Sequence, residues 1–259
     1  MAEEFLREQE PHRHGRPARQ RIVWDLTSVL GVTAHCAELL DSGATLPPEA
    51  MRDDVIARGV RLRRMLISPD TGELVDLTRD SWVLARAHGS EDLPPADLHV
   101  TVETWLHAAL TTGDLTDCSQ EQRRLVREVC AALASADGQL RQVVHALLAA
   151  PMTADDLDDA PDVYEPSTAL AEFVALRDRH PTNPTAGPTS AAAADVDHTV
   201  AFGAGGRTMR DNLASVSRRW HLLKTHAGWT VTRTATGWTW TSPRGRTYET
   251  QPYDYRLGP

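Results

Sequence analysis

Cysteine is scarce in this sequence, and its spacing excludes two common ways of stabilising a small domain. Cys36, Cys118 and Cys130 lie far apart, so no two of them have the spacing of metal ligands. Three is also an odd number, which argues against a framework of disulfide bonds. No cysteine follows Cys130, so the C-terminal half of the chain cannot build a cysteine-based zinc site.

Long apolar runs are also missing. No stretch approaches the ~20 residues that a membrane-spanning helix needs. The first 21 residues, MAEEFLREQEPHRHGRPARQR, are charged and lack the apolar core of a signal peptide. Hydrophobic residues make up 41% of the chain and charged residues 24%, as in ordinary globular proteins. We therefore expect a cytoplasmic protein without a membrane partner.

Acidic residues outnumber basic ones over the whole chain, but the C-terminal region has an excess of basic residues. The chain has 27 basic and 36 acidic residues, and lysine occurs once, as Lys224. Residues 198–259 nevertheless contain nine Lys or Arg and three Asp or Glu, a net charge of +6, against −15 for the rest. A basic module on an acidic body predicts that the C-terminal region meets phosphate groups. Mixed charge that only keeps the protein soluble is the alternative for the asymmetry by itself.

Sequence patterns predict a mainly helical body over residues 19–180, after a disordered tail of residues 1–18. Ser119 and Gln122 have the spacing of a capping box at a helix start. Low-complexity residues 181–195, PTNPTAGPTSAAAAD, then predict a linker. Within the body we expect a hairpin over residues 68–78 and helices near residues 48–58, 100–110, 119–150 and 167–180.

The region after the linker carries the pattern that suggests chemistry. Asp197 and His198 lie in a β-prone stretch, and the glycine-rich loop GAGG follows them. A helix is predicted from Asn212 to a glycine stop at Gly228, and it contains His221. Residues 229–250 alternate with period two and predict a small antiparallel sheet. The order Asp-His, glycine loop, Asn-Leu, helix and His is that of the HNH nuclease motif.

The segment from Asp195 to Thr250 strongly resembles the C-terminal HNH region of the bacterial 13E12-repeat family, in which a domain of unknown function precedes an HNH domain. Its most specific pieces are NL…RRWHLLKTHAGW and WTSPRGRTY. The similarity covers roughly residues 17–86 and 163–251 and leaves the helical middle unplaced. Because it begins late in the family's N-terminal domain, we expect a truncated or short stand-alone version.

The resemblance implies a role for each matched residue. Asp197 would help to hold a divalent metal, Mg²⁺ or Mn²⁺, and His198 would be the general base that deprotonates the attacking water. Asn212 would orient that histidine or the metal, and His221 would complete the metal site or contact the scissile phosphate. Such chemistry needs a base with a pKa near neutrality and a hard cation that offsets charge on the phosphate. Seven basic residues are predicted to contact DNA: Arg207, Arg210, Arg218, Arg219, Lys224, Arg244 and Arg246.

The sequence departs from the family at the zinc knuckle. HNH domains of this type carry two cysteines before the Asp-His pair and a Cys-x-x-His or Cys-x-x-Cys in the helix, where this chain has Ser217 and Trp220. A tetrahedral zinc site cannot be built from these residues, so we predict no structural zinc. We expect apolar packing to hold the module instead, with four tryptophans as candidate core: Trp220, Trp229, Trp238 and Trp240.

These patterns predict an α+β protein, in which the mostly helical body is followed by a ββα-metal HNH module at residues 196–259. The predicted function is a metal-dependent DNA endonuclease of the HNH type, which hydrolyses phosphodiester bonds. The alternative is a non-catalytic DNA-binding or partner-binding relic of the HNH family, which the lost zinc ligands favour. A weaker third alternative is a regulatory helical protein whose C-terminal region only stabilises it.

Overall fold

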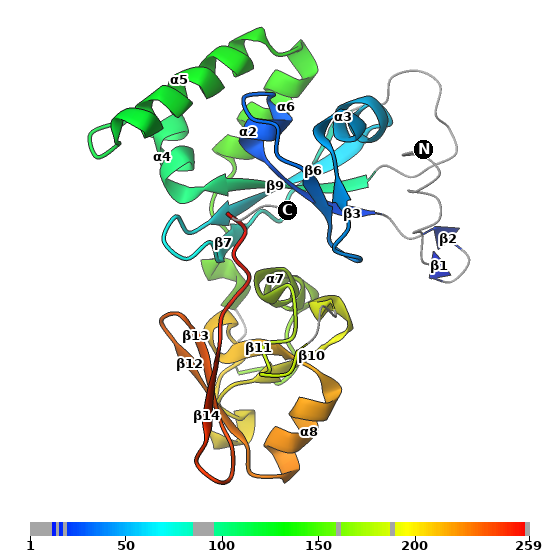
Figure 1. Ribbon diagram of the computed structural model, residues 1–259, viewed down its shortest axis with the longest axis vertical. Helices are drawn as coiled ribbons and strands as arrows, with labels where there is room; N and C mark the ends of the chain where they lie inside the picture. The colour runs from blue at the N-terminus through cyan, green and yellow to red at the C-terminus, as the bar shows by residue number, and fades with distance from the viewer. Residues whose placement is uncertain are drawn as a thin grey trace. The chain divides into compact units, whose positions relative to one another are not determined.

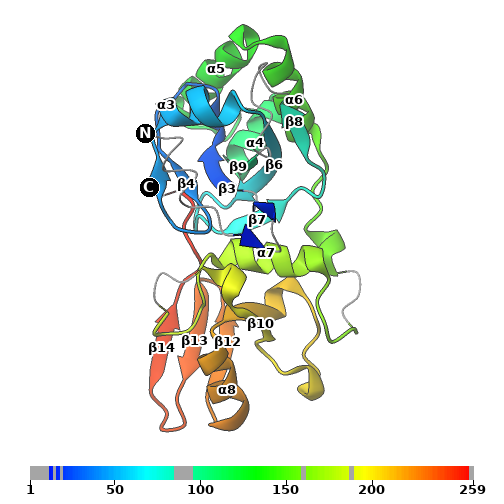
Figure 2. The same ribbon diagram turned by 90° about the vertical axis from the view of Figure 1, so that its right-hand side faces the viewer.

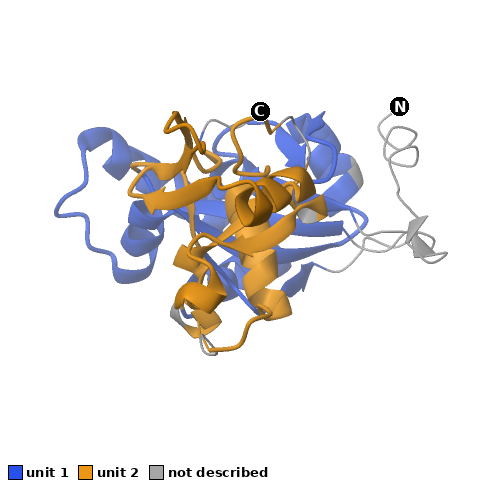
Figure 3. Cartoon of the chain, turned by 90° about the horizontal axis from the view of Figure 1, so that it is seen from below, with its two compact units in different colours: residues 1–69, 76–151, 256–259 blue, residues 70–75, 152–255 orange. Residues whose placement is uncertain are grey.

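The computed structural model describes residues 12–13, 16–17, 20–84, 96–158, 162–186 and 190–256. The chain divides into two compact units (Figure 3): the first comprises residues 1–69, 76–151 and 256–259, and the second residues 70–75 and 152–255. The second unit thus begins upstream of the module predicted at residues 196–259. The tail predicted to be disordered, residues 1–18, lies outside the described residues, except for the paired strands β1 (His12–Arg13) and β2 (Arg16–Pro17).

A seven-stranded mixed sheet dominates the first unit (Figure 1). The strand order is β5-β4-β3-β9-β6-β7, and β8 also pairs with β6. Strands β3, β9 and β6 run parallel, whereas β4 and β8 are antiparallel to their neighbours. The strands are β3 (Arg21–Asp25), β4 (Ala37–Leu39), β5 (Thr45–Leu46), β6 (Val60–Ile67), β7 (Leu74–Leu77), β8 (Trp82–Leu84) and β9 (Ala96–Glu103).

Helices of the first unit pack on this sheet. Figure 2 shows α4 and α6 beside β6, β8 and β9, which they contact. Ser119 and Gln122 form the predicted capping box at the start of α5. The helices are α2 (Leu26–Val29), α3 (Pro48–Ala50), which continues as the π-helical η1 (Met51–Ile56), α4 (Thr104–Thr112), α5 (Gln120–Ser135) and α6 (Gly138–Ala149).

A buried ion pair holds the end of α6 against the sheet. Arg64 in β6 and Asp76 in β7 are both fully buried, with Arg64 Nη2 2.9 Å from Asp76 Oδ2. Arg64 also donates to the backbone oxygens of Ala150, at 2.7 Å, and Pro151, at 3.1 Å. These carbonyls follow the last turn of α6, where a positive charge is favourable. The ion pair therefore joins two strands and a helix end inside the core.

The prediction of a mainly helical body was wrong. Residues 100–103, predicted as helix, belong to β9, whose residues 98–102 are all buried between β3 and β6. Short apolar runs fit either a helix or a buried parallel strand, and pairing with distant strands decides between them. The single helix predicted over residues 119–150 is two helices, because the backbone turns extended at Ala136 and Asp137 caps α6.

The second unit contains helix α7 and, after it, a hairpin followed by a helix (Figure 1). Strands β10 and β11 are antiparallel, with Asp197 opposite Ala214 and His198 opposite Leu213. The regular elements are α7 (Thr168–Asp178), β10 (Asp195–His198), β11 (Leu213–Val216), α8 (Arg218–His226), β12 (Thr230–Thr234), β13 (Gly237–Thr241) and β14 (Thr247–Thr250). The last three strands form the predicted antiparallel sheet. Single turns of 3₁₀ helix also occur: η2 (Asp155–Asp158) precedes α7, and η3 (Ala191–Ala193), η4 (Phe202–Ala204) and η5 (Arg210–Asn212) lie between α7 and β11.

The helix predicted from Asn212 to Gly228 was wrong in its first part. Residues 213–216 form β11, all four are buried, and they pair with β10 along their whole length. Ser217 is the N-cap residue of α8, so the helix begins at Arg218, six residues later than predicted. Asn212 therefore lies in the turn before a strand, and His221 in the helix after it. Within the described part of the chain, no helix has both the length and the apolar character needed to cross a bilayer.

Candidate functional site

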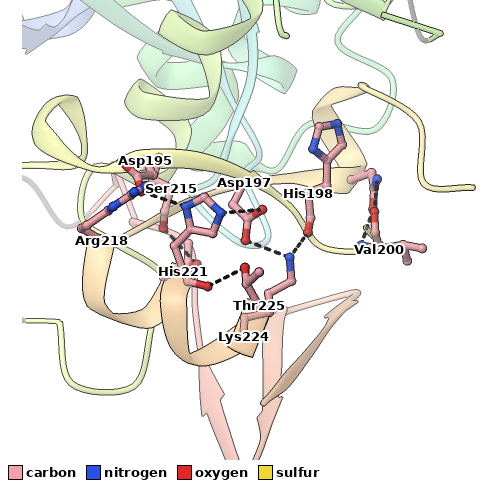
Figure 4. A network of polar contacts seen from close by, with 11 residues as sticks. Asp195, Asp197, His198, Val200, Ser215, Arg218, His221, Lys224 and Thr225 are labelled. Atoms are coloured by element: carbon pink, nitrogen blue, oxygen red, sulfur yellow. Dashed lines mark hydrogen bonds and ion pairs between the residues drawn. The ribbon is translucent and has the colours of Figure 1, made fainter. Parts of the chain in front are cut away.

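Asp197 and His198, the pair at the head of the motif, point to opposite sides of β10. They are consecutive residues of one strand, and successive side chains of a strand leave opposite faces. Figure 4 shows the ring of His198 directed away from a network formed by Asp195, Asp197, His221 and Lys224. The structure therefore brings Asp197 and His221 together and places His198 apart from them.

Asp197 uses its two carboxylate oxygens for two different partners on α8. Its Oδ2 accepts a hydrogen bond from Lys224 Nζ at 2.8 Å, and its Oδ1 lies 3.7 Å from His221 Nε2. The Lys224 ammonium also donates to the backbone carbonyl of His198. Lys224 is part of this network, with a side chain only 13% exposed. The carboxylate is thus bound by a cation on one side and faces an imidazole nitrogen on the other.

Asp195 completes the network, although it was not among the predicted site residues. Its Oδ2 is 2.8 Å from His221 Nδ1 and accepts a hydrogen bond from Arg218 Nη1 at 3.0 Å. Burial works to raise the pKa of Asp195, but the hydrogen bonds from His221 and Arg218 outweigh it and lower that pKa below its ordinary value. Asp195 and Asp197 are two residues apart in β10, so period-two alternation was the signal that could have placed them on one face.

His198 lies in a mostly aromatic niche and is only 5% exposed. Its Nε2 is 2.8 Å from Thr208 Oγ1, and its ring stacks on that of Tyr164, with centroids 5.4 Å apart. Phe202 packs against the same ring. Burial, opposed by Asp197 and helped by Lys224, lowers the pKa of His198 below its usual value. The imidazole is therefore neutral at pH 7 and covered.

Asn212 fastens the loop between β10 and β11. Its Oδ1 accepts a hydrogen bond from Val200 N at 2.8 Å, and its Nδ2 donates to the carbonyls of Val200 and Arg207. Gly206 passes so close to this point that an added Cβ would lie 1.8 Å from Val200 O. Asn212 was predicted to orient His198 or the metal, but its side-chain amide hydrogen-bonds the backbone of this loop instead.

The separation of Asp197 and His221 can be compared with that of two ligands of one small divalent cation. Ligand atoms about 2.0–2.2 Å from one ion lie roughly 3.0 Å apart at a right angle and roughly 4.3 Å apart in line. The 3.7 Å between Asp197 Oδ1 and His221 Nε2 falls within this range. Water would have to supply the remaining ligands, as it commonly does for Mg²⁺. Over the described ranges, no group of three or more His, Cys, Asp or Glu side chains is arranged to hold a metal.

Residues from the first part of the predicted linker bond to the start of α8. Asn183 Oδ1 accepts a hydrogen bond from Ser217 N at 2.9 Å, and Thr185 Oγ1 accepts one from Trp220 Nε1 at 2.9 Å. The carbonyl of Thr182 accepts the indole N–H of Trp240. Hydrogen bonds thus join this upstream segment to the start of α8 and to β13.

Tryptophan packing accompanies these bonds. Trp238 and Trp240 are fully buried, and Trp220 is nearly so, with its ring edge-on to that of Trp240. Trp229 is half-buried and packs against the same cluster. Three of the four tryptophans predicted as core are therefore buried, and the fourth lies at the margin of the core.

Two residues of α7, which the sequence did not single out, hold β11 in place. Asp178 Oδ2 accepts a hydrogen bond from Ser215 N at 2.6 Å, and Arg177 donates to the carbonyls of Leu213 and Arg210. Both side chains are buried. No pattern in the sequence marks an adjacent Arg and Asp at a helix end as partners of a strand 35 residues away, since the contact is purely tertiary.

The predicted DNA-contacting residues fall into two groups. Arg219, Arg244 and Arg246 have exposed side chains. The other four form ion pairs with carboxylates of the same unit: Arg207 with Asp162, Arg210 with Asp158, Arg218 with Asp195 and Lys224 with Asp197. The first group is therefore the better placed to meet a phosphate backbone.

Comparison with known proteins gives one partial match. The chain is 41% identical over 92 residues to the Uncharacterized protein Rv3776 of Mycobacterium tuberculosis (strain ATCC 25618 / H37Rv). The match covers 34% of this chain and 17% of that protein's length. No family model and no solved structure matches the chain.

Proposed function

We propose that the second unit is an HNH-type module that binds DNA and hydrolyses its phosphodiester bonds with a divalent cation held by Asp197 and His221. The observation that carries this proposal is the 3.7 Å approach of a carboxylate oxygen on β10 to an imidazole nitrogen on α8. The order of the motif residues along the chain, and the resemblance of this segment to the HNH region of 13E12-repeat proteins, support the same function.

A cation bound by Asp197 and His221 would offset the negative charge that builds up on the phosphate and the leaving oxygen. The Lys224 ammonium, on the other oxygen of Asp197, places a second positive charge beside the pair. Both features suit a phosphate group. The exposed side chains of Arg219, Arg244 and Arg246 can contact further phosphates, which would position DNA without reading its sequence.

His198 has the protonation state that a general base needs, because burial keeps its imidazole neutral at pH 7. Its ring lies on the other face of β10 from Asp197 and against the ring of Tyr164. Catalysis by His198 therefore requires two changes: Tyr164 must move off the ring, and the imidazole must reach the face of β10 on which Asp197 and His221 lie.

A non-catalytic DNA-binding module is the second candidate, and two contacts favour it. Lys224 already offsets the charge of Asp197, and Tyr164 covers the ring of His198. A module of this kind would bind phosphates through its basic residues and leave the backbone of DNA intact.

Nicking of supercoiled plasmid DNA by the purified full chain, with Mg²⁺ or Mn²⁺ added, separates the two candidates. We expect His221→Ala to lower the nicking rate about 100-fold or more, since a metal contributes several kcal/mol to the transition state. His198→Ala should lower it about 10²- to 10⁴-fold, as for loss of a general base. The matched control is His226→Ala, which removes an exposed histidine from the same helix and should nick at the wild-type rate.

DNA binding, measured separately by fluorescence anisotropy, completes the test. The three variants should still bind DNA, and the affinity should fall steeply as salt is raised, because phosphate contacts release counterions. A wild-type protein that binds DNA and never cleaves it with any divalent cation would identify the non-catalytic module. A protein that neither binds nor cleaves DNA would reject both candidates.

A further inference from the structure

His221 lies between two carboxylates that meet its two ring nitrogens differently (Figure 4). Nδ1 is 2.8 Å from Asp195 Oδ2, a normal hydrogen-bond length. Nε2 is 3.7 Å from Asp197 Oδ1, which is too long for a hydrogen bond. One nitrogen is therefore fixed by a strong acceptor, and the other faces an oxygen without bonding to it.

We infer that Asp195 is a positioning residue: by accepting the Nδ1–H of His221, it leaves the lone pair of Nε2 facing Asp197. The inference rests on the proposed function, because a lone pair at that position is useful to a module that holds a cation there. The inference adds Asp195 to the site as a residue that does not touch the cation itself but decides whether His221 can bind the cation.

The chemistry of imidazole explains this role. A neutral imidazole carries one proton, and the hydrogen bond made by one nitrogen decides which nitrogen keeps a lone pair. An ionised carboxylate can only accept hydrogen bonds, so Asp195 selects the form of His221 with the proton on Nδ1. Histidines that bind metals almost always donate their other ring N–H to a carboxylate, a carbonyl or water in this way.

The neighbours of Asp195 and Asp197 strengthen the arrangement. Arg218 Nη1 donates to the same oxygen of Asp195 that meets His221, so the acceptor is held from a second side. Lys224 takes the Oδ2 of Asp197 and leaves its Oδ1 facing His221. Both contacts come from α8, the helix that carries His221.

The tautomer of His221 can be observed directly by NMR of the full chain with ¹⁵N-labelled histidine, at pH 8 and without metal. We expect the Nδ1–H form in the wild type and a change to the Nε2–H form, which free histidine prefers, in Asp195→Ala. Asp195→Asn should keep the Nδ1–H form, because its amide oxygen can accept the same hydrogen bond. The charge-matched control is Asp211→Ala, which removes an exposed carboxylate from the turn before β11 and should change nothing.

A wild-type His221 in the Nε2–H form, or an Asp195→Ala variant that keeps the Nδ1–H form, would overturn the inference. A second measurement is Mn²⁺ affinity by electron paramagnetic resonance. It should fall about 10- to 100-fold in Asp195→Ala, as for other residues that orient a ligand, and much less in Asp195→Asn. Equal Mn²⁺ affinity in Asp195→Ala and wild type would also count against the role of Asp195. If the wild type binds no Mn²⁺ at all, the proposed function fails, and the NMR result still decides whether Asp195 sets the tautomer.

Discussion

His99, in the middle of the seven-stranded sheet, should make the first unit sensitive to mild acid. It lies in β9 and is 2% exposed. Burial, helped by the charges of Arg63 and Arg21, lowers the pKa of His99 from 6.5 to about 3. Between these two values the unfolded chain binds a proton at this position and the folded chain does not. Stability therefore falls as the pH drops below 6.5, and it would level off only near pH 3.

The size of this effect follows from the two pKa values. Each pH unit well inside the window costs about 1.4 kcal/mol, and the loss between pH 7 and pH 5 comes to about 2 kcal/mol. His99→Leu removes the titrating group and should lose about 2 kcal/mol less than wild type between pH 7 and pH 5. The comparison is made within each protein, so a general destabilisation of the variant does not affect it.

Urea unfolding at pH 7 and pH 5, followed by circular dichroism, measures both differences. His99→Gln, which is close to histidine in size, is a second variant in case the leucine variant folds poorly. The matched control is His145→Leu on the exposed face of α6, which removes a histidine without touching the sheet and should keep the wild-type loss. An acid-induced loss of the same size in wild type, His99→Leu and His99→Gln would refute the reasoning.

Three further predictions concern stability. Asp76→Ala leaves the buried charge of Arg64 without its carboxylate, so it should lower the free energy of unfolding by about 3–5 kcal/mol in urea unfolding. A loss below about 1 kcal/mol would show that the backbone carbonyls alone satisfy Arg64. Trp220→Ala should destabilise the second unit by about 3–5 kcal/mol in thermal unfolding, and Trp229→Ala should cost less because Trp229 is only half-buried. The reverse order would contradict the core described above. Chelation should leave the thermal midpoint of the wild type unchanged, because no four-ligand zinc set is available, and tightly bound stoichiometric zinc in elemental analysis would disprove this.

Local signals in the sequence predicted the elements that local interactions determine. The capping box of Ser119 and Gln122 and the antiparallel sheet after Gly228 both formed as expected. The capping box depends on a side chain that bonds a backbone amide three residues later, and the strands of the sheet pair with their neighbours in sequence across short turns. The alternation that puts Asp195 and Asp197 on one face of β10, with His198 on the other, is local in the same sense.

Only the tertiary structure decided which apolar runs became strands and what surrounds the candidate site. Residues 213–216 are strand because β10 pairs with them, and residues 100–103 are strand because β3 and β6 flank them. Tyr164 reaches His198 across 34 residues of sequence, and Asn183 reaches Ser217 across the same separation. Such contacts form because folding buries apolar surface and satisfies backbone groups wherever partners can be found. Their partners cannot be read from spacing along the chain. The sequence therefore pointed to Asp197, His198, Asn212 and His221 but not to Asp195, and the fold decided that Asp197 and His221 meet while His198 is covered.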